Sequence, residues 1–590
     1  MEAKWVVYGK KADFKAIGEK YNIDQVVARV LINRDVVGDD AIASYLQGSL
    51  KDTHSPSLME DMSKGCQIMA ESIRTEKSIC IVSDYDVDGV MSNYILYDGL
   101  KRLGANVSYK IPDRIIDGYG INERIIEEAH NEGVNVIITC DNGIAAVDAI
   151  ALAKSLGMRV VVTDHHAVPY DMDASGEKVE KLPPADAVID IMRETCAYPF
   201  KGICGATVAY KFIRNLYETM GVLWEDETRY IEMVAIATVC DVMELRDENR
   251  IYVREGLKLL KNTKNLGLKT LLSVNELSGK NLSAFHLGFV IGPCINATGR
   301  LSKADNGLEL LLEEDEDRAY TLANELLALN QERKSMTEEG VVEAIKQVEE
   351  KYKEDVVLVV YLPELHESIA GIVAGRLREH FYKPIYVITD TKEGTIKGSG
   401  RSIEGYHMFD ALTEVKDLLL KYGGHELAAG FSLAKENLEE FRRRLNVNQH
   451  LTEEELTPVV RLDVPMPIAY ISERLIEQLR LLEPFGKGNE KPIFGQSGLG
   501  IKRVIPMGKE KQYMKIFFQD SDGYVVEAMD FNGKHFIECI KMWFSDEECD
   551  KILKGMPNNV KLDVAYYPTI NEYGGRKTIQ IQPTLYRKTQ

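Results

Sequence analysis

Apolar runs alternate with amphipathic stretches along residues 78–165. Four short runs rich in Val and Ile occupy residues 78–84, 105–112, 134–141 and 159–166. The stretches between them, such as 122–133 and 145–157, carry apolar residues at helical spacing. Continuous Val/Ile runs that alternate with helices are typical of a parallel sheet covered on both faces. We therefore predict an α/β domain with a parallel sheet.

The pattern changes several times along the rest of the chain. Residues 1–75 are predicted to form a helical cap, and the parallel-sheet domain with a helical extension spans 76–320. A long polar-faced helix over 321–352 is expected to connect it to a smaller α/β domain at 353–455, with strands at 356–362 and 383–389. Short alternating segments split by Gly, Asn and Asp then predict an OB-like β-barrel over 456–590.

Composition places the chain among ordinary globular proteins. With 590 residues the chain is too long to fold around a single hydrophobic core. Apolar residues make up 45% of it and charged residues 28%. No run reaches the roughly 20 apolar residues of a membrane span, and the N-terminus lacks the apolar core of a signal peptide. Nine cysteines without a C-x-x-C pair argue against a disulfide framework or a thiolate zinc site. We expect a cytoplasmic protein that acts without a membrane.

The net charge of −20 argues against nucleic acid as a partner, because phosphate contacts need Lys or Arg. Binding responds to the local field, however, and residues 487–515 are rich in Lys and Arg interleaved with Tyr513, Phe517 and Phe518. Those aromatics either stack on bases or fill the barrel. Arg442–Arg444 form a second basic run, which is alternatively a solvated helix face. Any DNA path must therefore be a local basic track.

The segment Asp84-Tyr-Asp86-Val-Asp88-Gly89 follows the first apolar run. Asp84 and Asp86 are two residues apart, so at the end of a strand they point to the same side. A bound divalent cation usually offsets the repulsion between two such carboxylates. The alternatives are a solvated turn and a calcium loop, but the twelfth position of a calcium loop should be Glu and is Ile95.

Further Asp and His residues end comparable segments: Asp141, Asp164-His165-His166 and Asp241. A single Asp at a strand end is more often a helix N-cap than a ligand. Several together, at the carboxyl ends of parallel strands, favour a metal site. Mixed carboxylate and imidazole ligation suits Mn²⁺, with Mg²⁺ as a substitute.

The motifs D-Y-D-x-D-G, D-N-G, Asp164-His165-His166 and the later Asp241 resemble those of the DHH phosphoesterase superfamily. Within it, the chain is most similar to the RecJ family, whose further blocks occur here in order. These blocks begin at Ile111, Asp117, Asn296, Leu329, Gly398, Gly423 and Leu482. Asp190-Ile191 stands where the family often has Asn-Pro, Glu244 where it commonly has Pro, and Leu365-His366 where it usually has Trp-His. None of these departures removes a proposed ligand.

The resemblance implies a DHH domain, a DHHA1 domain at 353–455 and two metal ions. By this resemblance Asp84, Asp86, Asp141, His165 and Asp241 hold the ions, and His166 either ligates metal or meets the scissile phosphate. Asp88 is assigned to orienting the turn or to supporting a ligand. The implied chemistry is hydrolysis at phosphorus by a water that the metal pair activates.

The resemblance also implies the substrate contacts. Arg114, Arg300 and Arg401 are the expected phosphate ligands, because guanidinium matches phosphate bidentately. Ser399, Asn296 and His425 are expected to add hydrogen bonds, and Tyr119 to stack on a base. Each also has a structural alternative, since a lone Arg is usually a surface residue and Tyr119 would also fit simple packing in a turn.

The function that the resemblance implies is a single-stranded-DNA-specific exonuclease working from 5′ to 3′. It would release 5′-mononucleotides in DNA repair and recombination, as a monomer, with a single-strand-binding protein and a helicase as partners. The alternative is a DHH phosphodiesterase acting on short RNA or cyclic dinucleotides, which shares the metal site but generally lacks a C-terminal barrel. A non-catalytic relative is disfavoured because every ligand position is filled.

Overall fold

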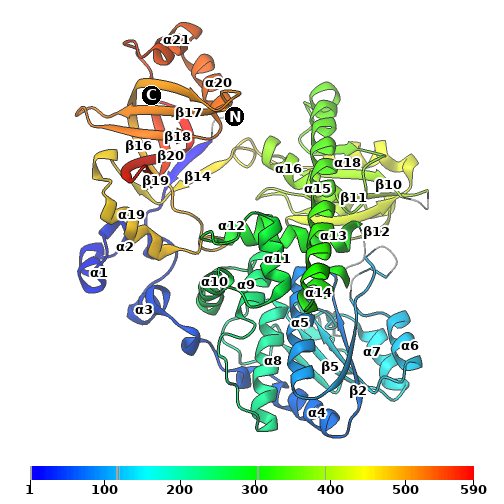
Figure 1. Cartoon of the computed structure of the whole chain (residues 1–590). Helices are drawn as coiled ribbons and strands as arrows, with labels where there is room; N and C mark the ends of the chain where they lie inside the picture. Colours follow the sequence, from blue (N-terminus) through cyan, green and yellow to red (C-terminus); the bar gives the residue numbers. More distant parts are fainter. Residues whose placement is uncertain are drawn as a thin grey trace. The chain divides into compact units, whose positions relative to one another are not determined.

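The computed structural model describes residues 3–114, 117–118, 120–173, 175–301, 305–391 and 394–589. The chain forms two compact units (Figure 1). One contains Gly48–Leu456, and the other combines Met1–Gln47 with Thr457–Gln590. Among the described residues, none of the helices combines the length and apolar character that crossing a bilayer requires.

The first sheet of the larger unit has five parallel strands in the order β3-β2-β4-β5-β8. The strands are β2 (Ser78–Ser83), β3 (Asn106–Lys110), β4 (Val136–Cys140), β5 (Arg159–Asp164) and β8 (Ala187–Asp190). The first four confirm the predicted apolar runs. β8 was not predicted from the sequence.

Alternate residues of these strands face two separate cores. Ile79 and Ile81 pack with α4 (Met62–Arg74), α5 (Val87–Arg102) and α8 (Gly205–Met220). Cys80 and Val82 pack on the other side, against α6 (Glu123–Asn131) and α7 (Val147–Ser155). Because both faces are apolar and covered, each strand reads as a continuous hydrophobic run.

Helices follow the first sheet. They are α9 (Ile231–Cys240), α10 (Asp247–Leu260), α11 (Leu266–Val274), α12 (Ala284–His286), the π-helix η3 (Leu287–Ile291), α13 (Gly292–Leu301) and α14 (Asp305–Leu312). The predicted connecting helix is α15 (Glu316–Gln347), which continues as the π-helical turn Val348–Tyr352. It begins earlier than predicted because Asp315 caps it by accepting a hydrogen bond from the Arg318 N–H.

The second sheet lies in the order β12-β13-β11-β10-β9. Its strands are β9 (Leu358–Tyr361), β10 (Ile385–Asp390), β11 (Ile396–Arg401), β12 (Leu419–Gly424) and β13 (Ala428–Leu433). Only β9 and β10 pair in parallel, around the crossover helix α16 (Ala370–Phe381). The other pairs are antiparallel. This is the smaller α/β domain that the sequence predicts.

The smaller unit is built on a β-barrel. Its strands are β16 (Phe494–Met507), β17 (Tyr513–Gln519), β18 (Val525–Asp530), β19 (Lys561–Tyr573) and β20 (Arg576–Lys588), and the pairing of β16 with β19 closes it. Two helices, α20 (Gly533–Trp543) and α21 (Asp546–Lys554), lie between β18 and β19 in the chain. The barrel confirms the architecture predicted from 456 onward.

The N-terminal residues join this barrel unit. β1 (Lys4–Val7) pairs in parallel with β14 (Val459–Leu462), and α2 (Gln25–Asn33) shares a core with Leu475 and Leu479. The Tyr45 hydroxyl donates to Asn489 Oδ1 over 2.7 Å. The cap expected over residues 1–75 is instead divided after Gln47, because α2 packs its apolar face against the C-terminal part of the chain.

Candidate active site

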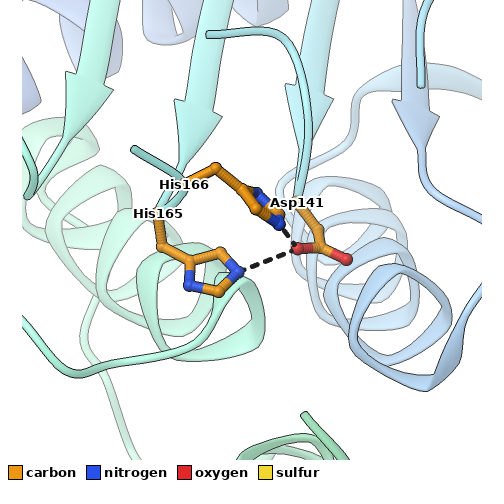
Figure 2. A group of neighbouring side chains, drawn as sticks. All are labelled: Asp141, His165 and His166. Atoms are coloured by element: carbon orange, nitrogen blue, oxygen red, sulfur yellow. Dashed lines mark hydrogen bonds and ion pairs between the residues drawn. The ribbon is translucent and has the colours of Figure 1, made fainter. Parts of the chain in front are cut away.

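Buried carboxylates and two histidines gather at the carboxyl edge of the first sheet. Asp84 follows β2, Asp141 follows β4, and Asp164 ends β5. Figure 2 shows the imidazoles of His165 and His166 directed toward the Asp141 carboxylate. The distances to Asp141 Oδ1 are 3.1 Å from His165 Nε2 and 4.0 Å from His166 Nδ1.

Asp84 and Asp86 flank a tight turn. β2 ends at Ser83, and Asp86 is the N-cap of α5, where its side chain accepts a hydrogen bond from the Gly89 N–H over 3.1 Å. A Cβ on Gly89 would lie 2.3 Å from the Asp84 carbonyl oxygen, so only glycine allows this approach. The two carboxylates therefore meet across a turn, and not as alternate residues of a strand as the sequence analysis expected.

Asp88 is fixed by the N-terminus of α8. Its two carboxylate oxygens accept hydrogen bonds from the backbone N–H groups of Gly205 and Ala206, over 2.6 and 2.7 Å. Free N–H groups at a helix N-terminus favour a negative charge. One of these oxygens also lies 3.5 Å from His165 Nε2. Asp88 thus connects α5 to the N-terminus of α8 next to His165.

Asp141 has a left-handed backbone, with φ of 60°. Such a conformation is costly for a residue other than glycine, and it is retained mostly where function requires it. The following residue holds the turn: Asn142 Nδ2 donates to the carbonyl oxygens of Val82 and Cys140, and its Oδ1 accepts from the Ile121 N–H. These bonds fix the end of β4 against the end of β2.

Asp241 is contributed by the helical extension. It is the C-cap of α9, and its Oδ2 lies 3.7 Å from His165 Nε2. The buried His165 imidazole thus has Asp88, Asp141 and Asp241 around one nitrogen. The structure brings together all seven residues that the sequence analysis named for catalysis or metal binding: Asp84, Asp86, Asp88, Asp141, His165, His166 and Asp241.

Crowding and burial shift the pKa values of these groups. Burial, reinforced by the charge of Asp86, raises the pKa of Asp84 to about 8. Burial and the neighbouring carboxylates also raise the pKa values of Asp86 and Asp141. Burial lowers the pKa of His165, which favours its neutral form. A set of carboxylates that resists ionisation next to a neutral imidazole is the environment that a bound cation stabilises.

His166 is held in the opposite state. Its Nδ1 lies 2.8 Å from Asp164 Oδ1. Burial alone would lower the pKa of His166, but the hydrogen bond to Asp164 and the surrounding carboxylates raise it to about 9. Burial would raise the pKa of Asp164, yet the bonds from His166 and from the Ile144 N–H hold it below its usual value. The pair is therefore an imidazolium and a carboxylate at neutral pH.

The donor set fits divalent metal ions. Three overlapping groups have ligand atoms within 4.8 Å of one another: Asp84, Asp86 and Asp141; Asp88, His165 and Asp241; and Asp141, His165 and His166. Asp84 Oδ1 is buried and accepts no hydrogen bond from the residues that the structure describes. Such an oxygen needs a partner, and carboxylates mixed with imidazole suit Mn²⁺ or Mg²⁺.

Arginines lie beside this edge. The Arg114 guanidinium stands 5.1 Å from the ring centre of Tyr85, and Arg300 Nη1 donates to the Ser368 carbonyl oxygen over 2.6 Å. Burial lowers the pKa of Arg300 to about 10, and the charges of Arg114 and Arg333 act in the same direction. Within the described ranges, Arg300 has no carboxylate at ion-pair distance. It is thus a cation available to an anionic ligand.

Ser399 and Arg401 belong to β11 of the second sheet. Ser399 pairs with Gly430 of β13, which pairs in turn with Gly423 of β12. The two glycines leave a cavity of about 330 Å³ beside Ser399, which Lys397 and Lys421 also line. Burial and Arg378 lower the pKa of Arg401. These groups form a second polar region of the same compact unit.

The remaining predicted contacts differ in their placement. Asn296 Oδ1 accepts a hydrogen bond from the Val87 N–H over 3.1 Å, which puts it next to Asp86. His425 is exposed in the turn between β12 and β13. Tyr119 lies outside the described residues.

Comparisons with known proteins follow the same division of the chain. Three family models match: the N-terminal domain of the DHH family over residues 78–238, the DHHA1 domain over 354–448 and the RecJ OB domain over 462–584. The single-stranded-DNA-specific exonuclease RecJ of Bacillus subtilis is 32% identical over 585 residues, covering 98% of this chain and 70% of that protein. This chain belongs to the RecJ family. Escherichia coli RecJ is also 32% identical, covering 91% of this chain and 92% of its own length.

Solved structures of RecJ proteins are similar as well. The crystal structure of Thermus thermophilus RecJ with Mn²⁺ has a TM-score of 0.80 and 25% identity, and the alignment covers 100% of this chain and 79% of that one. Another RecJ structure bound to manganese is 31% identical with a TM-score of 0.57, covering 66% of this chain and 94% of that one. Parallel sheet, long helix, DHHA1 domain and OB domain are thus confirmed for this RecJ-family chain.

The OB domain of this RecJ-family chain separates the aromatic residues named from the sequence. Phe518 is fully buried in the barrel core, whereas Tyr513 is 38% exposed. Lys515 lies between them on the outer face of β17, paired with Glu527 over 2.7 Å. Arg442, Arg443 and Arg444, in the DHHA1 domain, are each paired with nearby carboxylates. The three cations are thus already paired within the domain, and of the three only Arg443 is largely exposed.

Sequence reasoning missed two residues that position this RecJ-family site. Asp164 was treated only as part of a motif, although it determines the charge of His166. Asn142 was quoted in the D-N-G turn without a role, although it joins the ends of β2 and β4. An amide directly after a strand-end Asp is the signal that could have found Asn142.

Proposed function

We propose that this RecJ-family chain is a single-stranded-DNA-specific exonuclease that hydrolyses phosphodiester bonds from the 5′ end and releases 5′-mononucleotides. The observation that carries the proposal is the crowding of His165 Nε2 by Asp88, Asp141 and Asp241, at 3.5, 3.1 and 3.7 Å. It occurs in a chain whose relatives over nearly its full length are named single-stranded-DNA-specific exonucleases.

Two divalent ions are the proposed cofactors, held by Asp84, Asp86, Asp141, His165 and Asp241. The metals in similar crystal structures, Mn²⁺ and Mg²⁺, support this choice. Such a pair supplies an activated water and stabilises the attacking and leaving oxygens of an in-line displacement. The carboxylates release their protons on binding, because only their ionised form is a ligand.

The other residues at this edge of the sheet orient the proposed metal ligands or bind the substrate phosphate. Asp88 keeps its carboxylate fixed on the α8 N-terminus and so orients the Asp86 turn and His165. His166, protonated by virtue of Asp164, presents a cationic N–H to a phosphate oxygen. A charge-assisted hydrogen bond of this kind grows stronger as negative charge develops on phosphorus.

The polarity of the proposed reaction rests on arginines. Arg114, Arg300 and Arg401 are proposed to hold the 5′-terminal phosphate and the adjoining backbone, with Ser399, Asn296 and His425 adding hydrogen bonds and Tyr119 stacking on a base. The partial burial of Arg300 and Arg401 supports this, because a guanidinium kept from water and from carboxylates gains most from an anionic ligand.

The OB domain is proposed to hold the strand beyond the catalytic unit, as OB folds commonly do. We infer a monomeric cytoplasmic enzyme of DNA repair and recombination, because its substrate is single-stranded DNA exposed during those processes. A single-strand-binding protein and a helicase are the partners we propose, since one coats that substrate and the other produces it.

Digestion of end-labelled strands tests the proposal. Single strands labelled at the 5′ or the 3′ end are incubated with Mn²⁺ and with the unsubstituted protein, Asp141→Asn or the exposed control Asp148→Asn. We expect the 5′ label to appear first as mononucleotide, with full activity in the control and none detectable in Asp141→Asn. Release of the 3′ label first would overturn the polarity.

Cyclic dinucleotides distinguish the alternative function. Faster turnover of these than of single-stranded DNA, measured at equal Mn²⁺, would replace the proposed function by a small-nucleotide phosphodiesterase. Slower turnover would retain it.

A further inference from the structure

One helical segment carries a continuous accessible stripe toward the active site. α12, the π-helix η3 and α13 follow one another without a break from Ala284 to Leu301. Five residues of this segment that are not buried follow one another at spacings of four, four, three and four positions. They are Phe285, Phe289, Pro293, Asn296 and Arg300. Residues spaced in this way lie on one face of a helix. The stripe joins two aromatic residues to two proposed substrate ligands.

The C-terminal half of the stripe is at the reaction centre. Asn296 accepts from the Val87 N–H, one residue after Asp86. Arg300, one turn further on, is partly buried beside Tyr85 and Arg114. If Arg300 holds the 5′-terminal phosphate, a strand bound along the helix passes Asn296 and then runs toward Phe289 and Phe285.

The N-terminal half presents two stacked rings. The Phe285 and Phe289 ring centres lie 4.9 Å apart with planes inclined by 20°, and the residues are 60% and 63% exposed. The opposite face of the helix is fixed against α9: Cys240 Sγ lies 3.5 Å from the Leu287 carbonyl oxygen, and a Cβ on Gly288 would meet Val239 at 3.3 Å. The rings are therefore held on a segment that packs against α9, the helix whose C-cap is Asp241.

We propose that Phe285 and Phe289 form a stacking platform for bases of the substrate strand on the 3′ side of the scissile bond. The proposal rests on the proposed function and adds to it a residue-level base contact. Phe289 precedes Asn296 by seven residues, which is about 10 Å along a helix. The platform is thus within a few nucleotides of the Asp86 turn.

The chemistry of the platform suits single-stranded DNA. Two near-parallel rings present an outer face that continues a stack of bases, and every base offers a π-face. Such a contact is tolerant of sequence, as an exonuclease requires. It is also unavailable to bases paired in a duplex, whose faces are already stacked on each other. The platform therefore favours single strands without adding positive charge to an acidic protein.

A scan with abasic nucleotides tests the platform. Single strands of equal length carry one abasic site at successive positions from the 5′ end, and KM and kcat are measured with Mn²⁺. For the unsubstituted enzyme we expect KM to rise roughly tenfold when the missing base is one that stacks on the platform. In Phe285→Leu/Phe289→Leu the KM for the intact strand rises to a similar level, and the abasic site no longer matters at those positions.

Matched variants separate stacking from packing. Leucine retains apolar bulk but not the flat ring, whereas Phe285→Tyr/Phe289→Tyr keeps the ring and should behave as the unsubstituted enzyme does. The thermal midpoint is measured for each variant. Equal abasic profiles in the unsubstituted enzyme and the leucine variant would overturn the platform. So would a leucine variant that only unfolds earlier, which would indicate that the rings pack against protein.

Different results contradict the proposed function and the stacking platform. An unsubstituted enzyme that digests no single strand overturns the proposed function and the platform with it. An enzyme that digests single strands with the same KM in all three forms overturns the platform alone.

Discussion

Asp164 accepts two hydrogen bonds from the same residue, from the backbone N–H of His166 at 3.2 Å and from its ring Nδ1 at 2.8 Å. The strand-end carboxylates therefore have different roles. Asp141 on the neighbouring strand is directed at both histidines, whereas Asp164 fixes the ring and charge of one of them. The motif Asp164-His165-His166 thus contains a proposed metal ligand, His165, and a carboxylate, Asp164, that orients His166.

Asp164→Asn should shift the pH dependence of catalysis. The pKa of His166 is raised to about 9, so the imidazolium is present below that pH and is lost as pH rises through it. Removing the carboxylate lowers this pKa and moves the alkaline limb of kcat to lower pH, with a loss of roughly 10- to 100-fold near pH 8. A pH profile of kcat from 6 to 10 checks this. An unchanged alkaline limb would count against the role of Asp164.

Gly205→Ala should disturb the metal site without changing any charge. A Cβ at Gly205 would lie 2.8 Å from the Cβ and 3.1 Å from the backbone Cα of Asp141, so the strained turn must move. We expect weaker Mn²⁺ binding in calorimetry and a lower thermal midpoint.

The control is Gly375→Ala in α16, where a Cβ would meet no atom within 4 Å. Alanine in a helix interior is favoured over glycine by up to about 1 kcal/mol, so this variant should be slightly more stable with unchanged Mn²⁺ affinity. Equal effects of the two substitutions would contradict the proposed contact.

Stability should depend on pH in opposite ways with and without metal. The pKa of Asp84 is about 8 in the folded protein against an ordinary value of 3.8. The folded protein resists ionisation of this carboxyl, whereas the unfolded chain does not. The metal-free fold therefore keeps the full contribution of Asp84 to its stability below about pH 4 and loses it as pH rises toward 8. Mn²⁺ binds the ionised form, so the rise in Tm that it causes should grow from pH 6 to pH 8.

Thermal unfolding after chelation and after Mn²⁺ addition measures both trends. Asp84→Asn should flatten the metal-free dependence over this range. A Mn²⁺-induced rise that is larger at pH 6 than at pH 8 would be inconsistent with buried carboxylates as ligands.

Gly430→Ala should weaken substrate binding while leaving the fold intact. A Cβ at Gly430 has only the Gly398 carbonyl oxygen nearby, at 4.0 Å, and it would narrow the cavity beside Ser399. We expect KM for single strands to rise on the order of tenfold, because small displacements of a bound substrate are costly. Gly500→Ala in the barrel, with its nearest atom at 3.7 Å, is the control. A lowered thermal midpoint without a change in KM would contradict this assignment.

The first sheet was predictable because burial on both faces leaves a strong signal. The runs at 78–84 and 134–141 contain β2 and β4, each ending next to its Asp. β8 was missed because two short strands, β6 (Tyr170–Met172) and β7 (Lys178–Glu180), and no helix lead to it, so the alternation of strand and helix does not mark it. The period of two along β17 could have separated Phe518 from Tyr513, since alternate residues of a strand face opposite sides.

Contacts between distant segments were not predictable from a single sequence. Asp88 is 117 residues from Gly205, and no spacing indicates that its carboxylate sits on that helix N-terminus. The packing of α2 against residues near 475 likewise depends on which apolar faces meet. The seven clustered Asp and His residues were found because they follow predicted strands or helices, or stand in motifs that resemble those of the family. The groups that orient them are determined by tertiary structure.

The rate of Mn²⁺-dependent nucleotide release from single-stranded DNA tests the central claim most directly. It is compared between the unsubstituted protein, Asp84→Asn at the buried cluster and Asp148→Asn at the exposed start of α7. We predict that Asp148→Asn matches the unsubstituted rate and that Asp84→Asn is slower by at least roughly 100-fold, since ligand loss removes the metal chemistry. A full rate in Asp84→Asn would contradict catalysis at the carboxyl edge of the first sheet.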